Sequence, residues 1–223
     1  MKLLSSALSP YAARVRLAIY ARNLPVEIAP SGLWASTGAK SPDYLAINPI
    51  GKVPTLVLDD GTAIPESDTI VEYLADAFPD AELRPRKAED IARARLLARI
   101  TDLYIVGPGG GLLPQVLSTN RDAARVESGI AAMSEGLGYL SHYLRDEPYA
   151  AGPSLTTADC ALVPHLFFFP GLVAAVLGSK DLIARHKSVA DYQRRIQDDP
   201  AVTKLLGEMR TALASSRLKA LVE

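Results

Sequence analysis

Short strand-like stretches and a helix-like stretch alternate at the start of the chain. Lys2 to Leu4 and Val26 to Ile28 have the length and apolar content of strands. Between them, residues 10–21 repeat apolar side chains with the period of an α-helix, which leaves Arg14 and Arg16 on the outer face. A strand, a helix and a strand in this order predict a βαβ unit with two parallel strands.

The following residues complete a small α/β domain. A short helix, two strands and a longer helix are predicted at residues 43–47, 55–58, 63–64 and 67 to about 78. Asp59-Asp60-Gly61 lies between the two strands and is a strong hairpin signal, so these strands should be antiparallel. Ser67 is expected to cap the last helix. The order βαβ, α, ββα is the thioredoxin-like layout, a mixed sheet with helices on both faces.

The rest of the chain has the period of helices only. Pro79 to Arg86 contains two prolines and four charged residues, which predicts a linker. Helical periods then occupy Lys87 to Val106, Arg121 to Arg145, Thr156 to Phe169, Ser188 to Asp198 and Ala201 to Leu218. Thr156 followed by Asp159 has the spacing of a capping box, a folding signal. We therefore predict a thioredoxin-like α/β domain over residues 1–78, a linker over 79–86 and an all-α domain over 87–223.

Composition and charge narrow the class of partner. A chain of 223 residues can bury one large or two modest cores. Its net charge of -1, from 24 basic and 25 acidic residues, gives no attraction to nucleic acid or to an anionic membrane, so a small-molecule ligand is expected. No secretory signal and no apolar stretch of about 18 residues is visible, which predicts a soluble, cytoplasmic protein. One cysteine and three widely spaced histidines predict no disulfide and no metal site.

The segment from Asn48 to Leu56, NPIGKVPTL, predicts a binding edge for an extended peptide. Pro54 opens a strand and cannot donate a backbone hydrogen bond, so the backbone of Val53 is expected to stay unpaired. An extended ligand can hydrogen-bond to such an edge. Ten residues after the segment, the Glu66 carboxylate can accept from an amine, while Ser67 and the first amides of its helix can donate to a carboxylate. This combination suits an α-amino acid head group.

Ser9 stands where the first strand gives way to the first helix, and Pro10 suits the first helical position. The residues alone leave two roles open, an N-cap worth about 1 kcal/mol and a reactive hydroxyl. A Ser-His-Asp triad is not indicated, because no histidine occurs in the first 141 residues. Ser5 and Ser6 are rivals for a hydroxyl role, but both should lie at the strand end, before the helix starts, and Ser6 ranks second. Cys160 falls on a predicted helix, where a small buried side chain is expected.

Three segments together resemble the glutathione transferases. They are SPYAARVRLAI from Ser9 to Ile19, DYLAINPIGKVPTL from Asp43 to Leu56 and IPESDTIVEYLAD from Ile64 to Asp76. Their order, spacing and residue types agree with the family over about the first 80 residues, which is far more specific than any single motif. The resemblance is to soluble serine-type members of zeta-like, theta-like or bacterial class.

The resemblance implies a role for each candidate residue. The Val53-Pro54 peptide would be cis, Val53 would pair with the cysteinyl backbone of glutathione, and Glu66 with Ser67 would hold the γ-glutamyl head. Ser9 would supply the catalytic hydroxyl, because the family's hydroxyl stands five residues before the arginine of an RVRLA-like run. Glutathione would therefore be a co-substrate.

Other charged residues have less definite roles. Lys52 is expected to meet the glycyl carboxylate of the tripeptide, although zeta-type relatives often carry glutamine there. Lys40 is expected to be a solvated lysine, and Asp68 to serve the dipole of its helix. In some relatives an acid reaches the γ-glutamyl amine across a subunit boundary, and for Asp102 that role stays open. Family members are usually twofold dimers, so a homodimer is expected.

The chemistry expected of Ser9 concerns the glutathione thiol. A free thiol has a pKa of about 8.5 and is mostly unreactive at neutral pH. Lowering that pKa to about 6.5 requires roughly 2.7 kcal/mol of preferential stabilisation of the thiolate. A hydroxyl that donates to a thiolate can provide roughly 1.5 to 3 kcal/mol, and a helix N-terminus roughly 0.3 to 1 kcal/mol more. Ser9 is therefore expected to act as a hydrogen-bond donor that needs no base.

The second substrate is expected between the domains, where apolar concave sites form. Candidate lining residues are Tyr11, Leu33, Trp34, Tyr104 and the run Gly107 to Pro114, GPGGGLLP, which predicts a loop or a helix break. The implied reaction is attack by the glutathione thiolate on a hydrophobic electrophile. Two alternatives stay open: a glutathione-dependent isomerase, lyase or dehalogenase similar to maleylacetoacetate isomerases, and a glutathione-binding or interaction module without turnover.

Overall fold

A four-stranded mixed sheet forms the centre of the N-terminal part. The computed structural model describes residues 1–35 and 37–216, so residues 217–218 of the last predicted helix lie outside the described residues. The strands are β1 Lys2–Ser5, β2 Glu27–Pro30, β3 Thr55–Val57 and β4 Ala63–Pro65, in the spatial order β2-β1-β3-β4. β1 is parallel to β2 and antiparallel to β3, and β3 is antiparallel to β4. The predicted βαβ unit and hairpin are confirmed.

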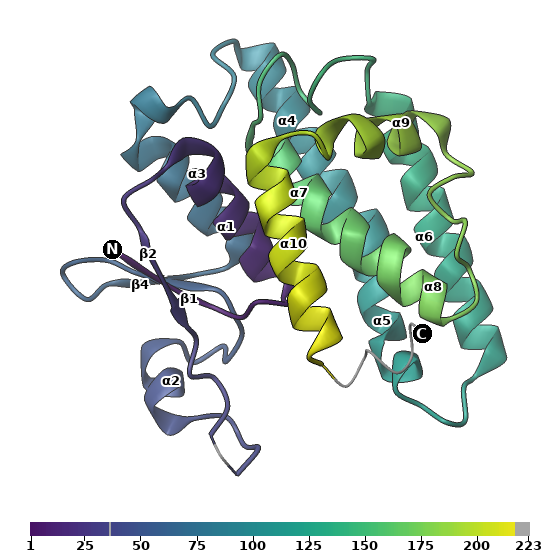
Figure 1. Ribbon diagram of the computed structural model, residues 1–223, viewed down its shortest axis with the longest axis horizontal. Coiled ribbons are helices and arrows are strands. Elements are labelled where there is room, and N and C mark those ends of the chain that lie inside the picture. Colours follow the sequence, from purple (N-terminus) through teal and green to yellow (C-terminus); the bar gives the residue numbers. More distant parts are fainter. Residues whose placement is uncertain (36, 217–223) are drawn as a thin grey trace.

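Three helices complete the thioredoxin-like layout. They are α1 Pro10–Arg22, α2 Pro42–Ile47 and α3 Ser67–Ala77, and a 3-10 turn at Pro79–Ala81 follows. α1 and α3 lie side by side on one side of the sheet, and α2 lies beyond its opposite side (Figure 1). The prediction that Ser67 caps α3 is wrong. The chain turns into the helix one residue earlier, at Glu66, so Ser67 is already the first helical residue, and the Glu66 side chain makes no cap hydrogen bond.

The C-terminal part begins with one long run of helix. α4 Ala88–Ile100, a π-helical segment Thr101–Val106 and α5 Gly107–Val116 follow one another without a break. The prediction of a loop or helix break over Gly107 to Pro114 is therefore wrong. Pro108 has no N–H to place in the helix, and the wider turn before it lets Gly107 donate to the carbonyl of Asp102, five residues back.

The remaining helices pack around one central helix. They are α6 Ala123–Tyr143, α7 Thr157–Leu166 with a π-helical segment Phe167–Val173, α8 Ala174–Val176, α9 Lys187–Ile196 and α10 Pro200–Ala214. α7 lies in the middle of the helical part, against α1 and α4 (Figure 1). The stretch Thr157–Val176 is long and apolar enough to cross a membrane, but 78% of its most apolar window is buried inside the protein. It is a core helix by its surroundings.

The start of α7 is fully enclosed and fully hydrogen-bonded. Thr156 caps the helix and forms the predicted capping box with Asp159. The Asp159 carboxylate accepts from the N–H of Ala150 and of Thr156, both at 2.8 Å, and from the Tyr192 hydroxyl at 2.9 Å. Burial raises the pKa of Asp159, against the effect of these hydrogen bonds. Cys160, next in the chain, is completely buried, and burial raises the pKa of its thiol well above the usual range.

Two arginines of α1 join the N-terminal part to the helical part. Arg14 and Arg16, expected on the outer face of α1, are only 2% and 4% exposed. The Arg14 guanidinium lies 2.5 Å from the Asp102 carboxylate, and that of Arg16 lies 2.6 Å from Glu208 of α10. The prediction that these arginines lie on the outside of α1 is wrong. Arg14 and Arg16 are two residues apart, about 200° around the helix, and each is covered by a different element of the helical part, so both charges are buried and paired.

Candidate active site

One cavity collects five of the six predicted site residues. Lys52, Val53, Pro54, Glu66 and Ser67 line a cavity of about 420 Å³. Its other lining residues are Tyr11, Asn48, Pro65 and Leu113. Leu113 belongs to the helical part, so the cavity lies between the two parts of the molecule. Ser9 is not among the lining residues.

The loop before β3 bends at Val53, which lines the first cavity. The Val53-Pro54 peptide is cis. Among the described residues, neither the N–H nor the C=O of Val53 has a hydrogen-bond partner, as predicted. The backbone groups that an extended ligand would use are therefore free at this cavity.

Asn48 and Tyr44 hold this loop in place, and sequence reasoning missed both. The Asn48 amide donates to the carbonyl of Lys52 at 3.0 Å and to the Thr55 hydroxyl at 2.8 Å. The Tyr44 hydroxyl donates to the same Lys52 carbonyl at 2.6 Å. Asn48 is only 1% exposed. The signal in the sequence was Asn-Pro-x-Gly, where Asn48 accepts from the N–H of Ile50 in an Asx turn.

The turn into α3 is strained and open. Glu66 has φ of 69°, a conformation that a residue with a side chain adopts only at a cost of about 1 to 3 kcal/mol. The Glu66 side chain is exposed, and no ion pair or hydrogen bond of its carboxylate occurs among the described residues. Ser67 is 5% exposed, and the first N–H groups of α3 have no partner inside the helix. An acceptor and a set of donors thus face the same cavity.

Ser9 is the N-cap of α1. Its hydroxyl oxygen accepts from the N–H of Ala12 at 3.3 Å. That bond uses a lone pair and leaves the hydroxyl proton available to an acceptor. Ser6 is exposed and lines a different cavity of about 500 Å³, together with Arg16 and Trp34.

A second cavity adjoins the first. It has a volume of about 520 Å³ and shares Tyr11, Glu66 and Ser67 with the first cavity. Its remaining lining residues are Arg14, Asp68, Thr69, Arg99, Asp102, Val106, Gly107 and Gly110. The two cavities share three lining residues and therefore adjoin; together they are called the cleft between the N-terminal part and the α4-to-α5 run.

An ion-pair cluster closes the inner wall of the second cavity. Arg14 contacts Asp102 at 2.5 Å and Asp68 at 3.4 Å. Asp68 stands in the first turn of α3, as its predicted dipole role requires, and it also takes part in this cluster. Because Asp102 pairs with Arg14 inside the chain, its carboxylate has a partner within its own subunit.

Tyr11, which lines the cleft, and the buried His165 behind it are both neutral. Tyr11 is 38% exposed, and its ring meets His165 edge-on at 5.1 Å. Burial raises the pKa of Tyr11, and the Asp102 carboxylate adds to this effect. His165 is fully buried, its Nδ1 donates to the Ala161 carbonyl at 2.7 Å, and burial lowers its pKa well below 6.5. Neither group is charged at neutral pH.

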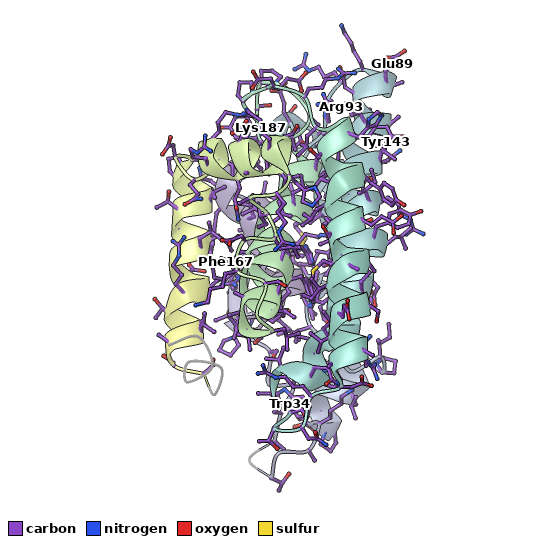
Figure 2. All side chains as sticks on the ribbon, turned by 90° about the vertical axis from the view of Figure 1, so that its right-hand side faces the viewer. Trp34, Glu89, Arg93, Tyr143, Phe167 and Lys187 are labelled. Atoms are coloured by element: carbon purple, nitrogen blue, oxygen red, sulfur yellow. The ribbon has the colours of Figure 1, made fainter. Side chains whose placement is uncertain are left out.

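The remaining candidates lie outside this cleft. Trp34 is 63% exposed and lies at the end of the molecule opposite to Tyr143 (Figure 2). Tyr104 packs edge-on against Tyr139 at 5.3 Å on the surface. Lys40 is exposed and pairs with Trp34 in an isolated β-bridge. Within the described part of the chain, no group of three or more histidine, cysteine or acidic side chains could hold a metal ion.

Comparison with known proteins agrees with this architecture. The family model described as "Glutathione S-transferase, N-terminal domain" matches residues 3–82, and "Glutathione S-transferase, C-terminal domain" matches residues 121–195. Glutathione S-transferase GstA of Escherichia coli O157:H7 is 33% identical over 181 residues, which are 79% of this chain and 80% of that protein.

Two further similarities bear on fold and function. The maleylacetoacetate isomerase of Pseudomonas aeruginosa is 29% identical over 171 residues, 75% of this chain and 80% of that protein. The crystal structure of Gtt2 from Saccharomyces cerevisiae has a TM-score of 0.73 at 26% identity and covers 92% of this chain and 100% of its own. The chain thus shares its fold with the last of these proteins and a sequence relationship over 75% or more of its length with the other two, and it belongs to the glutathione S-transferase family.

Proposed function

We propose that this protein is a serine-type glutathione transferase. Glutathione lies along the cleft, its cysteinyl backbone on Val53, its γ-glutamyl head on Glu66 and Ser67, and its glycyl carboxylate near Lys52. The observation that carries the proposal is the single cavity of about 420 Å³ in which these groups meet. It combines the unpaired backbone of Val53 with the strained, open start of α3.

In this proposal Ser9 stabilises the thiolate. Its cap bond to Ala12 leaves the hydroxyl proton free, and the start of α1 adds the positive end of a helix dipole. The two contributions together match the roughly 2.7 kcal/mol needed to shift a thiol pKa by two units. His165 is fully buried, and burial lowers its pKa well below 6.5, so it is a poor proton acceptor, which supports a mechanism without a histidine base.

The electrophile approaches from the helical side. The thioredoxin-like domain, residues 1–78, binds glutathione, and the helical domain, residues 87–223 after a linker at 79–86, shapes the site for a hydrophobic electrophile. Tyr11 and Leu113 line the cavity from opposite sides of the domain boundary. The product is a thioether of glutathione, formed in the cytoplasm as part of detoxification.

The test measures the thiolate directly. Ser9→Ala should abolish the excess ultraviolet absorbance of bound glutathione thiolate at neutral pH and lower the conjugation rate by about 10- to 150-fold, the equivalent of one hydrogen bond to a charged acceptor. Ser6→Ala is the matched control and should change neither. If wild type shows no more thiolate than Ser9→Ala, the assignment of Ser9 fails.

A second candidate function is glutathione-dependent isomerisation. The similarity to a maleylacetoacetate isomerase over 75% of the chain favours it. In that reaction the thiolate adds to the substrate and later leaves, so glutathione is regenerated. Counting free thiols during turnover separates the two: a conjugating enzyme consumes one glutathione per product, and an isomerase consumes none. A protein that binds glutathione but converts neither class of substrate would be an interaction module.

We also propose a homodimer formed through an aromatic surface of the helical domain. Tyr104, Tyr139 and Tyr143 are 46%, 41% and 45% exposed on the π-helical segment and α6, and Figure 2 shows Tyr143 at the surface near one end of α6. Three exposed tyrosines so placed suit a protein interface. Tyr139→Glu should convert the dimer to a monomer in light scattering. Trp34→Glu, at an exposed aromatic residue elsewhere, should leave the dimer intact.

A further inference from the structure

The loop that carries Ser9 has few contacts of its own. Between the end of β1 and the start of α1, Ser6 and Ala7 are exposed, and Leu8 is partly buried against the core. The N–H of Ser9 donates to the carbonyl of Ser6 at 3.2 Å, which closes a turn. The cap bond that Ser9 accepts from Ala12 is 3.3 Å long, beyond the usual N–H···O distance of about 2.9 to 3.0 Å. The position of the Ser9 hydroxyl therefore depends on what holds the loop.

The side chain of Arg16 holds this loop. Its guanidinium donates through Nη2 to the carbonyl of Ala7 and through Nη1 to the carboxylate of Glu208, both at 2.6 Å. Ala7 stands two residues before Ser9. In the part of the chain that the structure describes, no other side chain from outside the loop hydrogen-bonds to residues 6–8. Arg16 is 4% exposed, so water does not compete for its two charged hydrogen bonds.

Arg16 is fixed in turn by contacts between α1 and α10, which lie side by side (Figure 1). The Tyr20 hydroxyl lies 3.0 and 3.1 Å from the two Glu208 oxygens and donates to them. Burial, followed by this hydrogen bond, raises the pKa of Tyr20 to about 12, so the hydroxyl keeps its proton at neutral pH. The Lys204 ammonium lies 3.8 Å from the centre of the Tyr20 ring. These contacts set the place of the Glu208 carboxylate and, through it, the direction of the Arg16 guanidinium.

The same arrangement occurs a second time, away from the cleft. Arg93 of α4 is 10% exposed and donates through Nη1 to Glu147 at 2.6 Å and through Nη2 to the carbonyl of Ala150 at 3.0 Å. None of these three residues lines the first or the second cavity. The two arginines thus make equivalent contacts, but only Arg16 holds a loop that leads to a predicted site residue. Arg93 is therefore the matched control for Arg16.

We infer that Arg16 is a positioning residue for the reaction: by holding the Ala7 carbonyl it fixes the loop that places the Ser9 hydroxyl, and Glu208 of α10 fixes Arg16. The inference rests on the proposed transferase function, in which Ser9 donates to the glutathione thiolate. Arg16 lines neither the first nor the second cavity, so it acts through the loop and does not touch the peptide. Helix α10 is thereby connected to the activation of the thiol.

The first test compares Arg16→Lys with Arg93→Lys. Lysine keeps the charge but lacks the planar group that spans two acceptors. The thiol pKa of bound glutathione is read from the ultraviolet absorbance of the thiolate over a series of pH values. Arg16→Lys should raise that pKa by about one unit, which lowers the thiolate fraction, and with it kcat below the pKa, about tenfold. Arg93→Lys should change neither, although the melting temperatures of the two variants should fall by similar amounts. An unchanged thiol pKa in Arg16→Lys would overturn the inference.

Binding of S-methylglutathione separates positioning of Ser9 from a general loss of the site. This ligand has no thiol to ionise, so a displaced Ser9 hydroxyl should not matter to it. Its Kd, measured by calorimetry, should therefore change by less than about twofold in Arg16→Lys. A Kd that rises by the same factor as kcat falls would show that Arg16 supports the whole site and would overturn the inference.

Glu208→Ala is the second variant, at a residue that is 33% exposed on α10. Removing a negative charge near a thiol would by itself favour the thiolate and lower the thiol pKa. A loosened Arg16 should instead raise it, by about 0.5 unit, which corresponds to a roughly threefold smaller thiolate fraction. Glu147→Ala, at the acid that pairs with Arg93, should leave the thiol pKa unchanged. A fall or no change in Glu208→Ala would overturn the inference.

A double-mutant cycle with Ser9→Ala tests whether Arg16 acts through Ser9. Arg16→Lys should raise the thiol pKa of bound glutathione in wild type and add nothing in the Ser9→Ala background, because the group that it positions is then absent. An equal rise in both backgrounds would overturn the inference and leave the transferase function in place. If Ser9→Ala itself leaves the thiol pKa unchanged, the proposed role of Ser9 fails, and the inference fails with it.

Discussion

The starts of helices α7 and α3 differ in whether their first backbone N–H groups have hydrogen-bond partners. At α7, Thr156 and Asp159 are 3% and 0% exposed and satisfy the first N–H groups through a capping box. At α3, Glu66 adopts a positive φ, makes no cap hydrogen bond and leaves the first N–H groups open to a cavity. Both starts lie near the contact between the two parts of the chain. A helix end whose donors are fully used stabilises the fold, whereas one whose donors are left open can bind a ligand.

Removing the Asp159 carboxylate at the start of α7 should have the largest effect on the free energy of unfolding. Asp159→Ala deprives three buried donors of their acceptor, so the free energy of unfolding should fall by about 3 to 5 kcal/mol. Urea denaturation followed by circular dichroism measures it. Asp68→Ala, in the first turn of the open start, is the matched control and should cost no more than about 1 kcal/mol, since its side chain is 62% exposed. Comparable losses of unfolding free energy in Asp159→Ala and Asp68→Ala would contradict the distinction between the starts of α7 and α3.

Helix α7 should also make the free energy of unfolding depend on pH, because its last turn contains the buried His165. Burial, followed by the charge of Arg14, lowers the pKa of His165 well below 6.5. Below pH 6.5 the unfolded chain gains a proton at this residue and the folded chain does not. The free energy of unfolding should therefore be highest above pH 6.5 and fall as the pH drops, with a limiting slope of about 1.4 kcal/mol per pH unit.

This slope can be assigned by substitution. Burial lowers the pKa of His186 as well, so the experiment is done in a His186→Gln background. Adding His165→Phe, which can still stack on Phe169, should remove the dependence between pH 6.5 and 5. A slope that survives this second change would show that another group is responsible.

Relieving the backbone strain of Glu66 at the start of α3 should stabilise the protein and weaken glutathione binding. Glu66→Gly allows the positive φ without penalty and should raise the free energy of unfolding by about 1 kcal/mol, the strain released less the entropy cost of a glycine. Glu66→Gln retains the strain and should be no more stable than wild type. Both should raise the Kd for glutathione, measured by calorimetry, by about tenfold, the value of one charged hydrogen bond. Equal stability of the two variants would argue against stored strain at this turn.

The smallest effect on the free energy of unfolding is expected at the start of α1. Ser9 and Thr156 each accept a helix N–H at 3.3 Å, but Ser9 is only half-buried. Ser9→Ala should therefore cost about 0.5 to 1 kcal/mol of unfolding free energy, against about 1 to 2 kcal/mol for Thr156→Ala. Denaturation curves of the two variants give the comparison. A larger cost at Ser9 would mean that its hydroxyl serves the fold more than the cap bond accounts for.

The sequence predicted features that depend on local chemistry. Pro54 before a strand and the Glu66-Ser67 pair predicted residues that line the first cavity. A proline lacks the N–H and a helix start leaves its first N–H groups unpaired, whatever surrounds them. Periodicity placed the strands and most helices for the same reason. The hydrogen bonds of Asn48 to the loop before β3 could not be predicted, because they depend on the folded conformation of that loop.

Features that depend on contact between the two parts could not be predicted this way. Arg14 and Arg16 looked like solvent-facing residues because the period of one helix carries no information about what packs on it. The run Gly107 to Pro114 looked like a break because glycine and proline are poor helix formers. Its helical state follows from the preceding π-helical segment and from the close contact of Gly109 with Phe169.

The π-helical segment Thr101–Val106 also determines the rotational phase of everything after it. Each residue of an α-helix turns the chain by about 100°, so the loss or gain of one residue in this segment would rotate α5 by that angle about its axis. With one residue more, Val106 and Leu112 would point where Gly107 and Leu113 do now; with one residue fewer, Pro108 and Pro114 would take these places. Chains of this family that differ in length at this one place should therefore differ in the substrates they accept, even if the sequences of their α5 helices are the same.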